Sequence, residues 1–186
     1  IMLKTILNQL TPITASLFSS KTRSKILACS LVLFNERGFN NVTTASIANK
    51  SSVLDGSLWY HFNTKKEILS AHIELLNQVF LKENQKTKST DPETIILGIF
   101  RAYDLIWDFR YIFRDDFKKS PAVDELVLRS TQNVNNYTDK WVEGRIDHSY
   151  ENGLLQIDSK EIQNISEITL VIGRYWLDYS GKKYPD

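Results

Sequence analysis

The chain has 186 residues, of which 42% are hydrophobic and 24% are charged, proportions ordinary for a soluble globular protein of one or two domains. Its single cysteine, Cys29, excludes an intrachain disulfide and a cysteine-rich metal site. No apolar run approaches the roughly 20 residues of a membrane-spanning helix. No secretory signal pattern opens the chain, so a cytoplasmic protein is expected.

The formal net charge of +1 hides an uneven distribution of charge along the chain. Residues 1–66 hold eight basic and two acidic side chains, so this first third carries +6. Residues 67–186 hold fifteen basic and twenty acidic side chains and carry −5. A basic head on a mildly acidic body suits a head that binds a polyanion, although a solvated basic face gives the same count.

Helices are expected along the whole chain, because seven glycines and four prolines leave long segments without a breaker. Residues 1–21 are interpreted as an N-terminal arm or a short helix, since Pro12 interrupts the helical spacing of the apolar residues before it. A helix over Thr22–Arg37 follows, with a broad apolar surface and Gly38 as its stop.

The stretch from Thr43 to Lys66 has the pattern of a short helix, a tight turn and a second short helix. Thr43 is expected to cap the first helix, and Leu58 and Phe62 are expected to anchor the second. Two such helices form a helix-turn-helix, whose second helix enters the major groove of DNA. Residues 22–66 are therefore assigned to a three-helix DNA-binding domain.

Residues 67–186 are interpreted as a second, wholly helical domain. A helix capped by Thr64 is expected to end in the polar run 82–90, which is the clearest boundary in the chain. Asp91-Pro92-Glu93 combines a cap, a proline at the first position and an acidic first turn, so it predicts a helix start. That helix is expected to bend or break near 108–112.

Two further long helices complete the prediction. Ser120-Pro121 is interpreted as the start of a helix that runs to about Glu151 and is closed by Gly153. A last helix is expected after Ser159. No strand of consequence is predicted, so the fold class is all-α.

The run TRSKILACSLVLFNERGFNNVTTASIANKSSVLDGSLWYHFNTKKEIL (22–69) resembles the DNA-binding domain of TetR-family transcriptional regulators. The matching features are the R-x-x-I-L helix that ends in F-x-x-x-G-F, the T-T-x-x-x-I-A helix, and V-x-x-G-S-L-W-Y-H-F followed by K-K-E-I-L. The resemblance implies that residues 91–186 form a ligand-binding and dimerisation domain. It also implies a cytoplasmic homodimer whose DNA binding responds to a small molecule.

Three positions at the start of the second short helix depart from the family pattern. Ser52 stands in the turn where glycine is common, and Leu54 stands where a serine or threonine usually caps the helix. Asp55 follows, and its carboxylate is expected to supply the missing cap acceptor. These departures concern the operator contacts and leave the expected fold unchanged.

The candidate DNA contacts lie in and around this helix-turn-helix. Trp59 and Tyr60 are adjacent, so they point about 100° apart on a helix and at least one is expected to be exposed. Gly56 would let the backbone approach DNA, although simple helix-start geometry also explains a glycine there. Lys65 is placed for a phosphate, although a lysine considered by itself is more often a solvated charge. The full candidate set is Thr44, Gly56, Ser57, Trp59, Tyr60, His61 and Lys65.

Aromatic residues of the second domain are candidates for a small-molecule pocket, because such sites are apolar with a few polar tips. An ordinary aromatic core is the alternative for each of them. The candidates are Phe100, Tyr103, Trp107, Tyr111, Phe117, Tyr137 and Trp141.

The last helix is apolar on more than one face and therefore needs burial on two sides. A homodimer would supply the second side, and a two-fold dimer would match a palindromic operator. The candidate interface residues are Ile165, Ile168, Ile172 and Trp176.

The preferred interpretation is a ligand-responsive transcriptional regulator, a repressor that binds double-stranded operator DNA as a homodimer and is released by a small apolar or amphipathic effector. The alternative is a helical dimeric module that binds a small molecule or a protein, with a degenerate DNA-binding head. No nucleophile–base pair, metal-ligand spacing or glycine-rich phosphate loop is present in the sequence, so no enzyme, metal or cofactor is expected.

Overall fold

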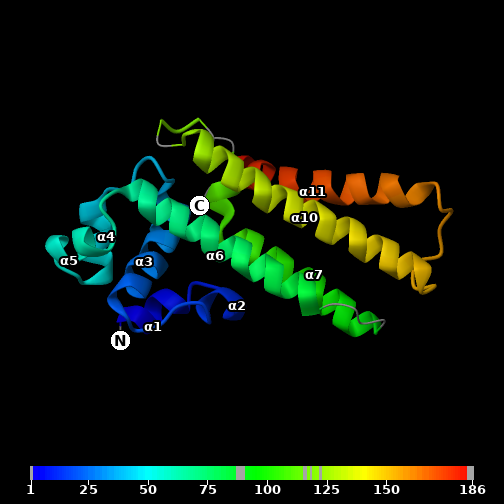
Figure 1. Cartoon of the computed structure of the whole chain (residues 1–186), viewed down its shortest axis with the longest axis horizontal. Coiled ribbons are helices and arrows are strands. Elements are labelled where there is room, and N and C mark those ends of the chain that lie inside the picture. The colour runs from blue at the N-terminus through cyan, green and yellow to red at the C-terminus, as the bar shows by residue number, and fades with distance from the viewer. Residues whose placement is uncertain (1, 87–90, 115–116, 118, 122, 184–186) are drawn as a thin grey trace.

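The computed structural model describes residues 2–86, 91–114, 117, 119–121 and 123–183, and every regular element within them is a helix. The molecule is elongated, with α4 and α5 at one end and the long helices α6, α7, α10 and α11 extending toward the other (Figure 1). The helices are α1 (Met2–Leu7), α2 (Pro12–Ala15), α3 (Thr22–Arg37), α4 (Thr44–Ser51), α5 (Asp55–His61), α6 (Lys65–Lys86), α7 (Pro92–Asp108), α8 (Arg110–Phe113), α10 (Glu125–Glu151) and α11 (Glu161–Lys183).

Helix α3 has the predicted bounds and forms the centre of the N-terminal domain. Its residues from Ile26 to Asn35 are all buried, and it ends where Gly38 takes a φ of 77°, a conformation that suits glycine. The cap of α4 is also as predicted: the Thr43 hydroxyl accepts from the Ser46 N–H at 3.1 Å, and Ser46 returns a bond in a capping box.

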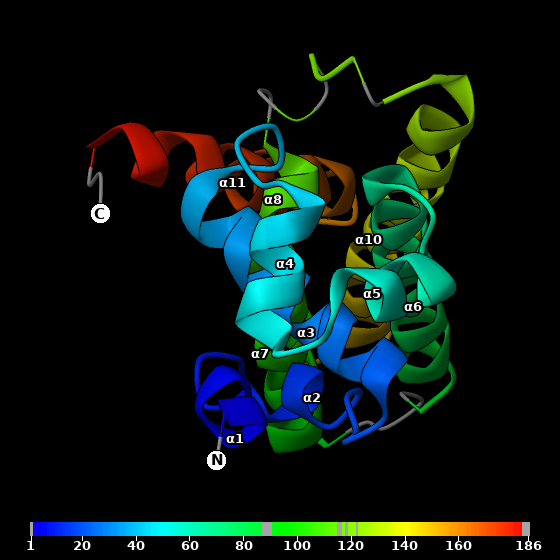
Figure 2. The same ribbon diagram turned by 90° about the vertical axis from the view of Figure 1, so that its left-hand side faces the viewer.

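Residues 2–21 fold onto the body of the molecule. Helices α1 and α2 pack against α3 and α7 respectively, and Figure 2 shows them beside α7 and below α4. The backbone N–H and the hydroxyl of Thr11 both donate to the Asp108 carboxylate, at 2.9 and 2.6 Å. This segment is thus bonded to the end of α7, and a short packed helix describes it better than an arm.

Helix α6 joins the two halves of the protein. It starts beside the helix-turn-helix and continues against α10, its most extensive neighbour (Figure 1). Lys66, in its first turn, forms an ion pair with Asp124 at the start of α10. The expected boundary between residues 66 and 67 therefore falls inside one continuous helix. Residues 87–90 of the polar run lie outside the described residues.

The predicted break near 108–112 is present, because α7 ends at Asp108 and α8 begins at Arg110. The predicted start of the next long helix at Ser120-Pro121 is wrong. The Ser120 hydroxyl donates to Asn40 Oδ1 at 2.5 Å, and the helix begins at Glu125, where Asp124 accepts from the Val127 N–H at 3.1 Å. A side chain already bonded across the molecule does not serve as a cap, and the next cap residue along the chain does.

Candidate functional site

Helices α4 and α5 form a helix-turn-helix whose turn is built without glycine. Ser52 takes a left-handed conformation with φ 49°, and the N–H of Val53 donates to the Ala48 carbonyl at 3.0 Å to close α4. Leu58 and Phe62 are buried against the domain core, as predicted. The two helices are thereby fixed relative to α3, and one side of α5 faces solvent.

That side of α5 exposes unusually large side chains. Tyr60 is 85% exposed, Trp59 is 47% exposed and Leu54 is 82% exposed. Figure 2 places α5 at the near end of the molecule, with no other helix in front of it. A Cβ added to Gly56 would meet no atom within 4 Å, so packing inside the chain does not require glycine at this position.

The remaining candidates surround this exposed face. Thr44 is the first residue of α4 and is half-buried, as are Ser57 and His61. The His61 ring lies edge-on to the Tyr60 ring with centroids 5.1 Å apart. Leu54 provides no side-chain cap for α5, and no bond from Asp55 replaces it, so the expectation that Asp55 caps this helix is wrong.

Lys65 has a structural role that the sequence did not indicate. Its ammonium donates to the carbonyls of Phe39 and Val42 at 2.8 and 2.9 Å and lies 4.4 Å from the Phe39 ring centroid. Partial burial lowers the pKa of this ammonium from its usual value. Lys65 therefore ties the start of α6 to the loop that follows α3, and its contact with phosphate stays a prediction.

Part of the basic charge of the head is used inside the molecule. Lys50 lies 3.7 Å from the Glu36 carboxylate, and Lys66 pairs with Asp124 of the body. Glu36 is already included in the +6 count, so only the pair of Lys66 with Asp124 lowers the charge that this domain presents to a polyanion.

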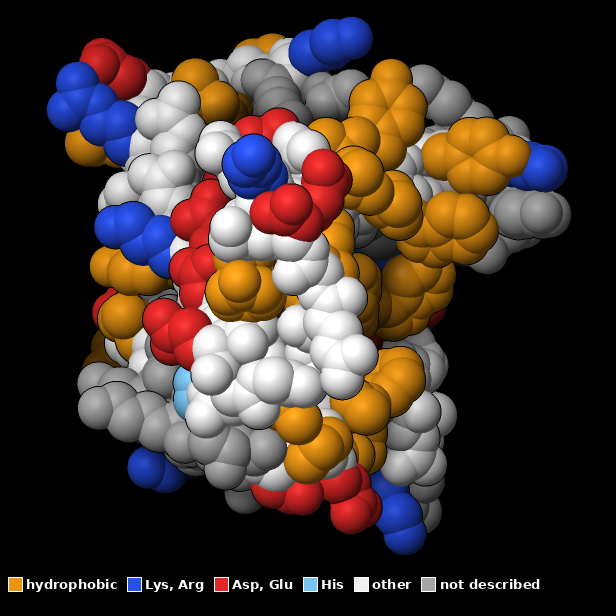
Figure 3. Space-filling view, turned by 90° about the vertical axis from the view of Figure 1, so that its right-hand side faces the viewer, with side chains coloured by type: hydrophobic (Ala, Val, Ile, Leu, Met, Phe, Trp, Pro, Cys, Tyr) orange, Lys and Arg blue, Asp and Glu red, His pale blue; other side chains and the backbone are white. Residues whose placement is uncertain are grey.

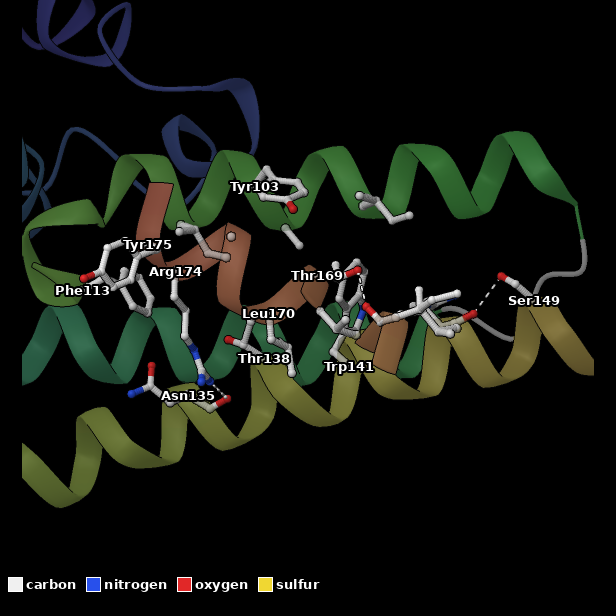
Figure 4. Close-up of a pocket in the computed structure, with 18 of the residues that line it drawn as sticks. Tyr103, Phe113, Asn135, Thr138, Trp141, Ser149, Thr169, Leu170, Arg174 and Tyr175 are labelled. Atoms are coloured by element: carbon white, nitrogen blue, oxygen red, sulfur yellow. Dashed lines mark hydrogen bonds between the residues drawn. The ribbon is translucent and has the colours of Figure 1, made fainter. Parts of the chain in front are cut away.

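A second candidate site is a cavity of about 540 Å³ in the body, lined mainly by α7, α8, α10 and α11. This volume is typical of small-molecule sites. In Figure 4, Tyr103 points from α7 into the space above α10, while Trp141 and Thr138 come from α10. The walls are largely apolar, and the described lining residues include no Asp or Glu.

The structure places only two of the predicted pocket residues, Tyr103 and Trp141, on this cavity. Trp107 lines a smaller neighbouring groove, and Phe100 is 62% exposed. The residues of α7 that face the cavity are Ile99 and Ile106, each one position before a predicted aromatic residue. Successive residues of a helix point about 100° apart, so a side chain one position from the lining points away from the cavity.

Three other predicted pocket residues do not line the cavity either. Tyr111 and Phe117 are buried beside Phe39, with ring centroids 5.7 Å apart from each other, and so belong to the core that joins the two halves. Tyr137 is half-buried on α10 away from the lining.

The sequence prediction considered only aromatic residues and therefore missed the polar residues that line the cavity. The hydroxyls of four of them donate to carbonyls of their own helices, at 2.7 to 2.9 Å. Arg174 forms an ion pair with Asp139, whereas Arg145 is only 6% exposed and lies over Trp141, 5.4 Å from the ring centroid. The missed polar residues are Thr131, Asn135, Thr138, Arg145, Ser149, Thr169 and Arg174.

A buried polar network lies between the cavity and the helix-turn-helix domain. His72 Nε2 is 3.0 Å from the Leu27 carbonyl, which can only accept, so Nε2 carries the proton and Nδ1 accepts from the Tyr111 hydroxyl at 2.8 Å. Burial lowers the pKa of His72 to about 4 and raises that of Tyr111, so both groups are neutral in this arrangement.

Exposed apolar side chains cover the outer sides of α7 and α11. Figure 3 shows them gathered at one edge of the end view, on the side where α7 and α11 lie. Of the predicted interface residues, Ile168, Ile172 and Trp176 are more than half exposed, whereas Ile165 lines the cavity. A continuous patch of this kind is typical of a protein interface.

Other kinds of site receive no support from the described residues. They contain no group of three or more His, Cys, Asp or Glu side chains that could hold a metal ion, and none of their helices is long and apolar enough to cross a membrane. The Cys29 thiol is buried, which raises its pKa to about 11, and it contacts the Lys50 carbonyl at 3.5 Å. A thiol that keeps its proton is a poor nucleophile.

Two family models match consecutive parts of the chain. The model described as "Bacterial regulatory proteins, tetR family" matches residues 26–72, and the model described as "Bacterial transcriptional repressor" matches residues 74–186. The two matches meet within α6, the helix that joins the two halves.

The individual proteins that this chain resembles are distant from it in sequence. The HTH-type transcriptional repressor KstR2 of Mycolicibacterium smegmatis is 26% identical over 137 residues, which are 69% of this chain and 67% of that protein. A TetR-family transcriptional regulator from Marinobacter aquaeolei superposes with a TM-score of 0.76 at 22% identity, over 88% of this chain and 82% of the other. The SmeT–triclosan complex superposes with a TM-score of 0.61 at 18% identity, over 86% and 79%.

Proposed function

Because the chain belongs to the TetR family of bacterial transcriptional regulators, we propose that it is a repressor that binds a palindromic operator as a homodimer and is released when a small molecule enters the cavity. The operator is double-stranded DNA, so the protein works in the cytoplasm. The seven candidate DNA contacts and the dimer surface are parts of the same proposal.

The observation that carries this proposal is the exposed face of α5. Tyr60 and Trp59 present large amphipathic rings to solvent, beside the open space in front of Gly56. Exposed aromatic rings are costly in water, whereas a phosphate backbone or a thymine methyl group gives them partners. A backbone without a side chain at Gly56 lets the start of α5 approach a groove closely.

Dimerisation through the α7 and α11 patch supports the same function. Ile172 and Trp176 are exposed on α11, and the groove between α7 and α11 runs along Trp107 and Gly173. A second copy related by a two-fold axis would cover this surface with the same residues. Such a dimer would present two recognition helices about 34–36 Å apart, or at a multiple of that distance, on one side of DNA.

The cavity supports release by a ligand through a shift in population. Ile112 and Phe113 of α8 line the cavity, while Tyr111 of the same helix is bonded to His72 on α6. A ligand that fits only one placement of α8 would therefore bias α6 and the head that α6 carries. SmeT, which has the same fold, forms a complex with the small molecule triclosan.

The proposal is tested by substitutions on α5. Tyr60→Ala is expected to weaken binding to a labelled duplex about tenfold or more at moderate salt, measured by fluorescence anisotropy, because one exposed ring contact to DNA is lost. Tyr150→Ala, at the far end of α10, is the matched control and should leave affinity unchanged (Figure 1). Unaltered DNA affinity in Tyr60→Ala and in Lys65→Met would contradict the repressor function.

A specific observation favours a second candidate function. Leu54 is exposed at the position of the α5 cap and provides no bond, and the acidic Asp55 follows it. Both residues are poor neighbours for a phosphate backbone. The alternative is a dimeric module that binds a small molecule or a protein and has lost DNA binding, and a failed Tyr60 test combined with intact ligand binding would establish it.

A further inference from the structure

We propose that the cavity binds an amphipathic carboxylate, with Arg145 as the residue that holds the charged group and the apolar walls holding the rest. The inference rests on the proposed function in taking this cavity as the effector site. It adds the charge and the chemical class of the ligand, which neither the fold nor the relatives specify.

The first observation is the state of Arg145. Its side chain is buried to all but 6% and lines the cavity. Among the described residues no hydrogen bond or ion pair reaches the guanidinium, and Nη1 is enclosed without any partner. The only described neighbour that stabilises its charge is the face of Trp141, at 5.4 Å.

The second observation is the contrast with Arg174, which lines the same cavity. Arg174 pairs with Asp139 and also reaches the Asn135 carbonyl, so its charge is compensated within the protein (Figure 4). No Asp or Glu lies among the described lining residues to compensate Arg145. A buried guanidinium stays charged and is costly without a counterion, and burial already lowers the pKa of Arg145.

The third observation concerns the Ser and Thr hydroxyls of the cavity. The hydroxyls of Thr138 and Ser149, on α10 near Arg145, donate to carbonyls of their own helix at 2.9 and 2.8 Å. Thr131 and Thr169 do the same. Their protons are therefore already used, and the strongest donor left for a ligand is the guanidinium. An acceptor with a negative charge suits this site better than a neutral polar group.

The size and walls of the cavity define the remainder of the ligand. Its volume of about 540 Å³ and apolar lining, which includes Ile99, Val142 and Leu155, suit a hydrocarbon or aromatic body. The planar fork of a guanidinium matches the two oxygens of a carboxylate. One uncompensated cation balances one anionic charge, so a monoanionic carboxylate fits better than a phosphate monoester, which carries more charge.

The test compares ligands that differ only in the charged group. Isothermal titration calorimetry on the full chain would measure octanoate, decanoate and dodecanoate against decanol and methyl decanoate. Decanoate is expected to bind more tightly than decanol by about tenfold to a hundredfold, as the loss of a charge-assisted bond implies. Arg145→Met should remove this preference, Arg145→Lys should restore part of it, and the control Arg129→Gln, at an exposed arginine outside the cavity lining, should keep it.

A second readout separates ligand binding from a structural role of Arg145. Without ligand, Arg145→Met should have the same or a higher melting temperature, because an uncompensated buried charge is replaced by an apolar chain. A lower melting temperature together with unchanged decanoate affinity would assign Arg145 a structural role and overturn the inference. Equal binding of decanol and decanoate, or no binding of any of the three carboxylates, would overturn it as well.

These outcomes are distinguishable from failure of the proposed function. Neutral ligands that bind the cavity and release DNA would refute the carboxylate inference and leave the ligand-responsive repressor standing. Arg145-dependent decanoate binding with no effect on a protein–DNA complex would support the inference and contradict release by a cavity ligand.

Discussion

His72 is the residue whose chemistry depends most on the fold. It is fully buried, donates from Nε2 to the Leu27 carbonyl at 3.0 Å and accepts at Nδ1 from Tyr111 at 2.8 Å. Both nitrogens are used by the neutral ring, and protonation would put a second donor against the Tyr111 hydroxyl. The ring links α6 to α3 and to α8, so its protonation state matters to the junction between the two halves.

Stability should therefore fall in acid. The pKa of His72 is lowered from 6.5 to about 4 in the folded protein, so between these values the unfolded chain binds a proton that the native state does not. His72 therefore contributes about 3 kcal/mol to the unfolding free energy above pH 6.5, and this contribution is lost as the pH falls toward 4. Urea denaturation across this range measures the loss, and His72→Gln should flatten the curve; an equally steep curve in that variant would contradict the assignment.

Substitution of Gly56 distinguishes a role in DNA binding from a role in helix geometry alone. Nothing in the chain lies near a Cβ at this position, so Gly56→Ala should leave the fold intact and stabilise it by up to about 1 kcal/mol. The added methyl group would lie where the start of α5 approaches the DNA, so DNA affinity should fall about tenfold in an anisotropy titration. Gly144→Ala in α10, where a Cβ also meets nothing, is the control that should gain stability and keep affinity. Equal affinities in both variants would leave Gly56 with a role in helix geometry alone.

At the scale of elements, the short helix α8 connects the cavity to the head. Phe113 lines the cavity, while the Tyr111 N–H donates to Asn35 Oδ1 on α3 at 3.2 Å. The Asn35 amide also donates to the Asp108 carbonyl at 2.6 Å, and the Asp108 carboxylate holds Thr11. Asn35 thus joins α3 to the junction of α7 and α8, and Asp108 joins that junction to the N-terminal segment.

Asn35→Leu, which is close in size, should disrupt this junction. It leaves the Asp108 carbonyl and the Tyr111 N–H buried without partners, at a cost of about 2–4 kcal/mol in unfolding free energy. Chemical denaturation monitored by circular dichroism would measure the change. Asn41→Ala, where an exposed amide bonds only to the Arg37 carbonyl, should cost little. Similar losses in both variants would show that Asn35 contributes no more than a surface bond.

Local signals along the sequence predicted most of the elements. The caps at Thr43 and Asp91 and the stop at Gly38 are where the residue types indicate, because caps act within one helical turn. The start of α10 was misplaced, since the Ser120 bond to Asn40 spans 80 residues and leaves no local signal.

The cavity was harder to predict, because its lining depends on how α7 is rotated against α10 and α11. Aromatic residues drew attention to the exposed face at Phe100 and Trp107, one position from the lining. Arg145 could have been found, since it continues the buried row of Val134, Thr138 and Trp141 at helical spacing. The signal is a cation, Arg145, within an otherwise uncharged buried row, and a search for aromatic residues alone does not detect it.

The whole molecule exposes an apolar surface on α7 and α11 that a monomer would leave in water (Figure 3). Sedimentation should therefore give about twice the chain mass of 21.5 kDa. Ile172→Glu places a charge in the proposed interface and should yield monomers with weaker DNA binding, whereas Leu154→Glu, in the loop before α11, should remain dimeric. A wild-type chain that sediments as a monomer at micromolar concentration would contradict the proposed interface.

Selection of bound duplexes from a random pool, at fixed salt, tests whether this chain binds an operator as a two-fold dimer. One inverted repeat should be enriched, with half-sites about one helical turn apart or a multiple of it, since a two-fold dimer presents two α5 helices. Enrichment should be clearly lower in Tyr60→Ala and unchanged in Tyr150→Ala. A pool that stays random after selection, or a consensus without two-fold symmetry, would contradict a dimeric operator-binding repressor.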